Sequence, residues 1–244
     1  MREYHSFSFK NANFRICTTH LQAAQREIRR QRRLLEAYIL RQPEFLRAME
    51  PLELLPEAPE VARRMAAAAA AAGVGPMAAV AGAMAQLAAE AALAEGAEEA
   101  IVDNGGDLYL VSPEPVLVAL YAGDHPLSGR LAFRIPPERQ PLSLCSSSGL
   151  MGHSQSLGEC DLATVVAADA ALADAAATLA ANLVRRVEDV QGALERVSGI
   201  AGVQGLLIVK GERVGVAGEL PELVRQEDPQ TGGKIPHDVE SGFR

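Results

Sequence analysis

The stretch AIVDNGGDLYLV, residues 100–111, places an Asn-Gly pair between two apolar runs. Asn-Gly in that setting is the strongest short-range signal for a β-hairpin, here joining strands at 100–102 and 108–111. The second glycine leaves another interpretation open. Because neither Gly105 nor Gly106 has a Cβ, their backbone amides can approach a ligand closely. The stretch therefore predicts a hairpin, with or without a ligand at its turn.

On either side of this stretch, short apolar runs typical of strands alternate with long alanine-rich runs typical of helices. The fold class that this pattern predicts is α+β, with mixed or mainly antiparallel sheets packed with long alanine-rich helices. Residues 1–226 are expected to form a single domain with two lobes, followed by a loosely ordered C-terminal tail at 227–244. The predicted elements are a strand pair within 7–18, strands at 116–121, 131–135, 142–145 and 163–168, a hairpin of 203–209 and 213–217, and helices at 21–40, 60–72, 77–95 and 169–184.

The charge balance argues against a nucleic-acid-binding protein. The chain has 23 basic and 31 acidic residues, for a net charge of −8, whereas nucleic-acid surfaces are basic. Residues 26–33 form one local basic cluster. Apolar residues follow that cluster at helical spacing, so we interpret it as the solvated face of a helix rather than an RNA or phosphate site.

The cysteines and the apolar stretches indicate the cellular setting. Cys17, Cys145 and Cys160 include no Cys-x-x-Cys pair, so they predict neither a disulfide framework nor a zinc site. The N-terminus lacks the apolar segment of an export signal. The longest apolar stretch, 66–94, is rich in alanine and interrupted by glycine and proline, so we expect no membrane span. We expect a soluble, cytoplasmic protein that does not contact a membrane.

Asp174 and Thr178 are candidate cation ligands in the helix expected at 169–184. They are four residues apart and share one helix face, and a carboxylate with a hydroxyl can hold one hard cation. A cation beside a glycine-lined pocket suits a diphosphate. The alternative is a carboxylate that caps a neighbouring loop and a threonine bonded to its own helix. In the helix at 77–95, Gly82 allows close approach of a second helix, which we favour, or of a ligand.

Residues 145–154, CSSSGLMGHS, combine small residues with one histidine. The Gly-x-Ser-x-Gly elbow is missing and no acid partner can be assigned, so the segment does not predict a nucleophilic serine. A zinc site built from His153, Cys160 and Asp161 would have no recognised spacing. Hydroxyls and backbone amides that contact a phosphate or ribose fit this composition better.

The order of these pieces, over roughly residues 77–217, resembles the ApbE family of FAD:protein FMN transferases. Ala81 stands where the family has a lysine, and Ser154–Gly158 replaces its Asp-Pro-x-Thr-Gly segment. The chain therefore resembles a cytoplasmic branch of the family more than a standard transferase. The residues that carry the resemblance are Ala81-Gly82, Asn104-Gly105-Gly106-Asp107, Ser147-Ser148-Gly149, His153, and Ala173-Asp174 with Thr178.

The resemblance implies that Asp174, Thr178 and a backbone carbonyl near Val80 coordinate Mg²⁺, with His153 as the candidate catalytic base. The expected function is Mg-dependent binding of FAD or a related nucleotide, with cleavage at the diphosphate or transfer of FMN to an acceptor protein. The alternatives are a nucleotide or cofactor carrier without catalysis, and a ligand-free structural homodimer formed through the apolar helices. The residues that the resemblance places around the nucleotide are Gly82, Asn104, Gly105, Gly106, Asp107, Ser147, Ser148 and Gly149.

Overall fold

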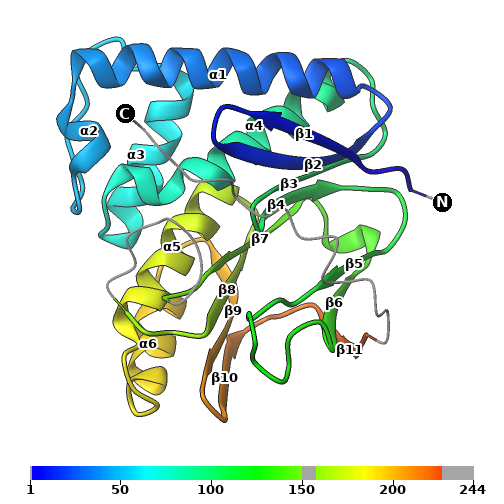
Figure 1. The fold of residues 1–244 in the computed structure, drawn as a ribbon, viewed down its shortest axis with the longest axis vertical. Coiled ribbons are helices and arrows are strands. Elements are labelled where there is room, and N and C mark those ends of the chain that lie inside the picture. Colours follow the sequence, from blue (N-terminus) through cyan, green and yellow to red (C-terminus); the bar gives the residue numbers. More distant parts are fainter. Residues whose placement is uncertain (1, 150–157, 227–244) are drawn as a thin grey trace.

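The computed structural model describes residues 2–149 and 158–226. It places an eight-stranded sheet between a layer of helices and a smaller, three-stranded sheet (Figure 1). The tail expected at 227–244 lies outside the described residues.

Both sheets are antiparallel at every pair of neighbouring strands. The predicted α+β class is thereby confirmed, and its sheets are antiparallel rather than mixed within the described part of the chain. The large sheet has the order β1 (His5–Phe9), β2 (Ala12–Thr18), β3 (Ala100–Asn104), β4 (Asp107–Val111), β7 (Leu142–Ser147), β8 (Leu162–Ala167), β9 (Val203–Lys210), β10 (Arg213–Gly218). The small sheet has the order β11 (Glu222–Arg225), β6 (Leu131–Ile135), β5 (Val116–Ala119).

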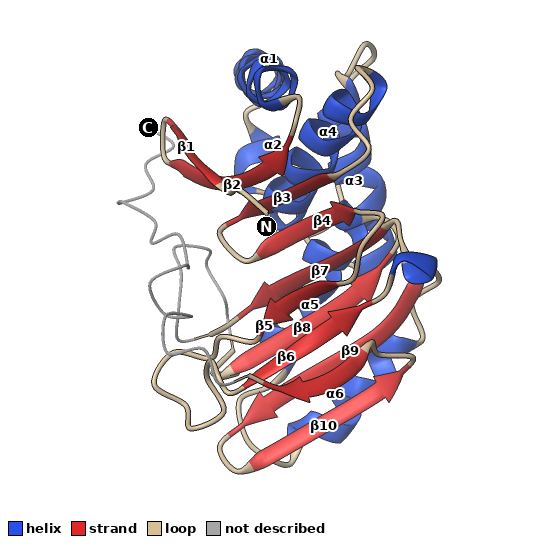
Figure 2. Cartoon of the chain, turned by 90° about the vertical axis from the view of Figure 1, so that its right-hand side faces the viewer, coloured by secondary structure: helices blue, strands red, loops and turns tan. Residues whose placement is uncertain are grey.

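The longer helices cover one face of the large sheet (Figure 2). Among them α4 contacts β3 and β4, α5 contacts β7 and β8, and α6 contacts β9 and β10. The small sheet packs on the opposite face, so the protein has three layers. The α-helices are α1 (Leu21–Arg41), α2 (Glu44–Arg47), α3 (Glu60–Ala72), α4 (Val80–Ala94), α5 (Ala170–Leu183) and α6 (Asp189–Ser198), with 3₁₀ turns η1 (Pro76–Ala79) and η2 (Pro137–Arg139).

The central strands of the large sheet are buried on both faces, which explains why they form continuous apolar runs in the sequence. In β4, Leu108 and Leu110 belong to the core shared with the small sheet, whereas Tyr109 belongs to the core under the helices. Successive side chains of a strand point to opposite faces. Asp107 therefore points the same way as Tyr109, which places an ionisable residue beneath the helix layer.

Pro76–Ala94 is long and apolar enough to cross a membrane, judged by length and composition alone. In the structure this segment is two elements, the turn η1 and the helix α4, where the sequence predicts one helix. The α4 helix contacts α1, α5, β3 and β4. A helix that is apolar nearly all round is typical of such a buried position, so packing accounts for its composition.

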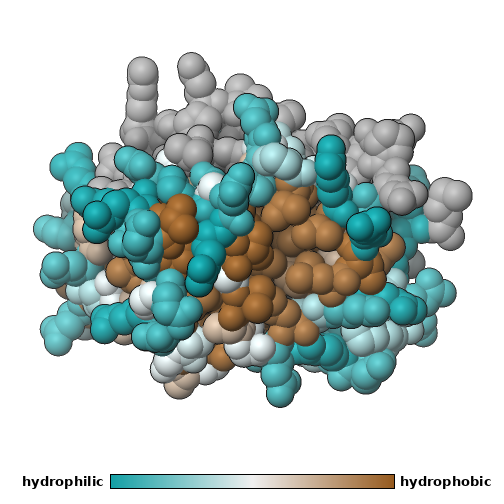
Figure 3. Space-filling model, turned by 90° about the horizontal axis from the view of Figure 1, so that it is seen from below, coloured by the Kyte–Doolittle hydropathy of each residue, from teal (hydrophilic) through white to brown (hydrophobic). Residues whose placement is uncertain are grey.

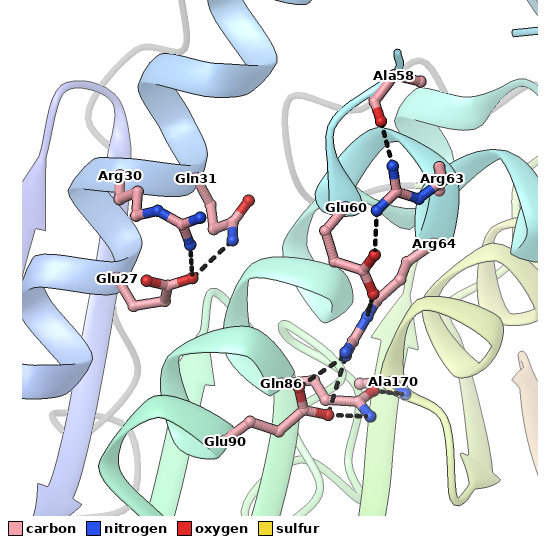
Figure 4. Close-up of polar contacts among 10 residues, drawn as sticks. All are labelled: Glu27, Arg30, Gln31, Ala58, Glu60, Arg63, Arg64, Gln86, Glu90 and Ala170. Atoms are coloured by element: carbon pink, nitrogen blue, oxygen red, sulfur yellow. Dashed lines mark hydrogen bonds and ion pairs between the residues drawn. The ribbon is translucent and has the colours of Figure 1, made fainter. Parts of the chain in front are cut away.

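Two of the five arginines in the basic cluster of α1 are paired with carboxylates of the same helix. Arg30 donates to Glu27 at 2.8 Å, and Gln31 donates to the same carboxylate at 2.6 Å (Figure 4). Arg32 donates to Glu36 at 2.9 Å. These pairs offset part of the positive charge that an RNA or phosphate ligand would need.

Candidate functional site

The turn between β3 and β4 is a two-residue hairpin. Asn104 pairs with Asp107 across the ladder, and the glycines between them have φ values of 69° and 106°. Gly105 and Gly106 are both exposed, and the Gly106 amide donates to Asp103 Oδ1 at 2.9 Å. The hairpin predicted from the sequence is confirmed, but its turn residues are Gly105 and Gly106 rather than the Asn-Gly pair, and both have the positive φ that such turns favour.

We expect the Gly106→Ala variant to lose about 1–2 kcal/mol of unfolding free energy, because L side chains rarely adopt such a backbone conformation. The loss would come from the backbone alone, since a Cβ at Gly106 would meet no atom within 4 Å. The matched control is Gly105→Asn, because asparagine tolerates the left-handed φ of 69° at that position. Chemical denaturation measures both variants, and equal losses would contradict this account.

Gly82 lies where α4 crosses α5. A Cβ at this position would lie 2.1 Å from the carbonyl oxygen of Ala170 and 2.9 Å from the Cβ of Asp174. Gly82 is therefore a helix-packing contact, the role favoured from the sequence, and its missing side chain opens no space for a ligand. The close approach allows the Gly82 amide to donate to Asp174 Oδ2 at 2.9 Å.

A chain of polar contacts fixes the start of α5 against α3 and α4 (Figure 4). Arg64 donates to Glu60 and to Glu90, each at 2.9 Å. Gln86 donates to Glu90 at 2.9 Å and accepts from the backbone amide of Ala170 at 2.8 Å. The amide of Ala170 belongs to the first turn of α5, where no partner exists within the helix. These contacts hold the helix that carries Asp174.

Two carboxylates lie buried between the helices and the large sheet, Asp174 of α5 and Asp107 of β4, each with 8% of its surface exposed. Burial raises the pKa of Asp174 to about 7, and the backbone amides of Gly82 and Ala81 offset part of the rise. Burial, and next the neighbouring Asp174 carboxylate, raise the pKa of Asp107 well above its ordinary value. Asp107 Oδ1 has no hydrogen-bond partner within the part of the chain that the structure describes.

Cys145 pairs with Asp107 across β4 and β7 and completes this buried cluster. Burial and the two carboxylates raise the pKa of its thiol well above the ordinary value. The thiol lies 3.5 Å from the carbonyl oxygen of Ala170, to which it donates. Because the thiolate is the form that attacks or ligates, Cys145 acts here as a packing residue.

The other predicted cation ligands lie close to Asp174. Thr178 is half-buried and follows Asp174 by one turn of α5, so the two residues share a face as expected. Val80 is the first residue of α4. Asn104 donates through Nδ2 to the carbonyl oxygen of Ala81 at 3.2 Å. The end of β3 and the start of α4 therefore meet beside Asp174.

The small-residue loop is described in part. Ser147 ends β7 and is half-buried. Ser148 Oγ donates to the carbonyl oxygen of Cys160 at 3.2 Å, and the Gly149 amide donates to the same carbonyl at 2.8 Å. His153 lies outside the described residues. The two contacts anchor the end of β7 to the residues that precede β8.

The donor chemistry around Asp174 fits a hard cation. Mg²⁺ prefers carboxylate, hydroxyl and carbonyl oxygens, and buried carboxylates need a proton or a positive charge. Within residues 2–149 and 158–226, no group of three or more His, Cys, Asp or Glu side chains is arranged to hold a metal ion. A cation here would therefore keep several waters. The sequence places Asp107 at the nucleotide but does not predict that it faces α5 and Asp174. Side chains alternate along β4, so Asp107 points to the same face as Tyr109, which packs under the helices.

Comparison with protein families and curated proteins gives close relatives. A family model described as AbpE bacteria matches residues 12–200. The UPF0280 protein of Methanocella arvoryzae is 46% identical over 191 residues, which cover 78% of each chain. The UPF0280 protein of Methanocaldococcus jannaschii is 38% identical over 221 residues, covering 88% of this chain and 89% of the relative. The matched span includes the hairpin, α4 and α5.

Solved structures share the fold at low identity. The flavin transferase ApbE from Vibrio cholerae has a TM-score of 0.54 at 12% identity, covering 93% of this chain and 97% of that one. The apbe protein from Thermotoga maritima has a TM-score of 0.52 at 14% identity, covering 92% and 97%. The expected fold is thereby confirmed.

Proposed function

Because the chain belongs to the AbpE bacteria family, we propose that it binds FAD or a related nucleotide together with Mg²⁺ and acts on the diphosphate. The observation that carries this proposal is the buried pair Asp107 and Asp174, in which one Asp107 oxygen has no hydrogen-bond partner among residues 2–149 and 158–226. A buried carboxylate pair destabilises a protein unless protons or a cation compensate it. Likeness in fold to flavin transferases directs the choice of ligand to a flavin nucleotide.

In this proposal Asp174, Asp107, the Thr178 hydroxyl and the Val80 carbonyl hold the cation. Bound Mg²⁺ supplies charge neutralisation at the diphosphate oxygens. The exposed turn Gly105-Gly106 borders the nucleotide, with Ser147, Ser148 and Gly149 on the other side of the site. His153 is the candidate base for an attacking hydroxyl or water.

The protein's own contacts orient these groups. The Gly82 amide holds one oxygen of Asp174, so the carboxylate keeps one orientation. Asn104 ties the hairpin to the first turn of α4 through the Ala81 carbonyl. The helices above exclude water from Asp107, which strengthens its attraction for a cation.

The first test is thermal unfolding with FAD and Mg²⁺ added separately and together. We expect Mg²⁺ to raise the Tm more with FAD present than without it, because the diphosphate supplies ligands that the protein lacks. The Asp174→Ala variant should lose the Mg²⁺-dependent part of the shift. Equal Mg²⁺ shifts in Asp174→Ala and wild type would contradict the assignment.

A second candidate function, a nucleotide carrier without catalysis, is favoured by Ala81 and the 154–158 segment, where the sequence departs from the ApbE pattern. Incubation with FAD, Mg²⁺ and an ApbE acceptor protein separates the two candidates. Release of FMN and AMP, measured by chromatography, supports cleavage, and covalent flavin on the acceptor supports transfer. FAD binding without either product supports the carrier. We expect binding or slow cleavage with little covalent transfer.

A further inference from the structure

The α4 and α5 helices are joined by two hydrogen bonds that lie one helical turn apart. The Gly82 amide donates to Asp174 Oδ2 at 2.9 Å, and the Ala170 amide donates to Gln86 Oε1 at 2.8 Å. Gly82 and Gln86 are four residues apart in α4, and Ala170 and Asp174 are four residues apart in α5. Residues with this spacing share one helix face. The two helices therefore meet in opposite directions along a single pair of faces.

Two bonds restrain α5 in a way that one bond does not. The Gly82 and Gln86 positions are separated by about 6 Å along the axis of α4. A single bond allows one helix to rotate about the other, whereas two bonds at this separation oppose both rotation and sliding. The Asp174 carboxylate forms the first bond, so its position depends on the bond that Gln86 forms with the first turn of α5.

Hydrogen-bond chemistry determines which way the Gln86 amide group points. The backbone N–H of Ala170 can only donate, so it faces the amide oxygen. The Glu90 carboxylate accepts from Gln86 Nε2 at 2.9 Å. Arg64 donates to Glu90 and to Glu60, each at 2.9 Å, and so keeps the Glu90 carboxylate in place (Figure 4). Reversing the amide group would break both bonds of Gln86.

We propose that Gln86 is a positioning residue for Asp174. Its amide oxygen holds the first turn of α5, so that the Asp174 carboxylate meets the Gly82 amide. Arg64 and Glu90 set the orientation of the Gln86 side chain. The inference rests on the proposed function only where it assigns a cation to Asp174. Replacing a residue that orients a metal ligand typically weakens metal binding about 10- to 100-fold, although the residue does not touch the metal.

The first test records amide NMR spectra of the protein without added metal. The Gly82 amide proton is bonded to a carboxylate, so its signal should move upfield when Asp174 moves away. We expect this shift in Gln86→Leu, which offers no acceptor to α5, and in Glu90→Leu, which releases the Gln86 amide group. Glu90→Leu replaces a partly exposed side chain, so it decides the question even if Gln86→Leu does not fold.

Gln191→Leu is the matched control for the loss of a glutamine side chain. Gln191 donates to Glu195 at 2.8 Å within α6, as Gln86 donates to Glu90 within α4. The control should leave the Gly82 signal unchanged, because the bond that it removes lies within one helix. An unchanged Gly82 signal in Gln86→Leu or in Glu90→Leu would overturn the positioning role.

Leucines that face the small sheet show whether the rest of the fold is kept. Figure 3 shows the end of the molecule seen from below, where apolar side chains gather. A hollow of about 180 Å³ between the two sheets is lined by side chains that include Leu162 and Leu207, and by none from α3, α4 or α5. The amide signals of these two leucines should be the same in every variant. Equal shifts at Gly82 and at both leucines would refute a role confined to the α4–α5 contact.

The second test titrates Mg²⁺ into the protein with FAD present, followed by calorimetry. We expect Gln86→Leu to bind Mg²⁺ about 10- to 100-fold more weakly than wild type, and Gln191→Leu to bind it as wild type does. Equal affinity in Gln86→Leu and wild type would show that Gln86 does not position the ligand. A wild type that binds no Mg²⁺ would contradict the proposed function instead, and the amide spectra would still decide whether Gln86 positions Asp174.

Discussion

The Gly82→Ala variant is expected to lose about 3–5 kcal/mol of unfolding free energy, a large fraction of the stability of an ordinary domain. The added Cβ would lie 2.1 Å from a backbone oxygen of α5, and a backbone atom cannot rotate away. The two helices must separate, and overpacking of this kind costs about 1–3 kcal/mol. Separation also weakens the bond from the Gly82 amide to Asp174, and a bond to a charged group contributes about 1.5–3 kcal/mol.

Chemical denaturation followed by circular dichroism measures this loss. Gly192→Ala is the matched control, because Gly192 is also a helical glycine but a Cβ there would meet no atom within 4 Å. The control should gain about 0.5–1 kcal/mol from the higher helix propensity of alanine. Similar stability of the two variants would contradict this expectation, because it would show that α4 and α5 can separate without cost.

The Asp174→Asn variant is expected to be more stable than the wild type at pH 8 without added cation, and similar to it near pH 4. Burial raises the folded-state pKa of Asp174 to about 7, against about 4 in an unfolded chain. The folded protein therefore keeps a proton that the unfolded chain loses. Wild-type stability should fall as pH rises from about 4 to about 7 and then level off, by an amount on the order of a few kcal/mol.

Asparagine stays neutral throughout this range and still offers an oxygen to the Gly82 amide. The variant's profile should be flatter, although Asp107 continues to titrate. Denaturation midpoints across the pH range test this, with Asp169→Asn as the control. Asp169 lies just before the same helix and caps it at Leu172, a role that asparagine retains. The proposed pH effect is refuted if wild type and Asp174→Asn show parallel profiles.

Added Mg²⁺ should stabilise the wild-type protein most at the pH values at which the charged Asp174 destabilises it. A cation at Asp174 displaces the proton, so its stabilising effect on the wild type should grow between pH 6 and 8. Asp174→Asn removes the charge and should lose most of this effect. A Mg²⁺ effect of the same size in both proteins would place the cation elsewhere.

Most of the secondary structure could be predicted because its signals are local. Gly105 and Gly106, both with positive φ, specify the β3–β4 hairpin, and Asp169 specifies the start of α5 by capping it. The helix expected at 21–40 matches α1 to within one residue. Short-range backbone conformation and hydrogen bonding determine these features, so nearby residues contain the information.

Among the elements that the sequence did not predict, α6 and β11 were missed for different reasons. The α6 helix has a readable signal, with Val190, Ala193, Leu194 and Val197 at helical spacing. The β11 strand, Glu222–Arg225, is short and ends in charged residues. It becomes a strand only because β6 offers its edge for pairing, a condition that the local sequence does not contain.

The sequence alone determined which residues form the hairpin and the helices, and it placed Asp174 and Thr178 on one helix face. Only the tertiary structure decided that Asp107 faces α5, near enough to Asp174 for the charge of Asp174 to raise the pKa of Asp107. Both faces of β4 are buried, so its apolar pattern does not reveal which face meets the helices. That choice depends on which layers cover the sheet, and Gly82 sets how closely α5 can approach α4. Contacts between residues far apart in the chain therefore create the carboxylate pair, because packing rather than local conformation brings the two side chains together.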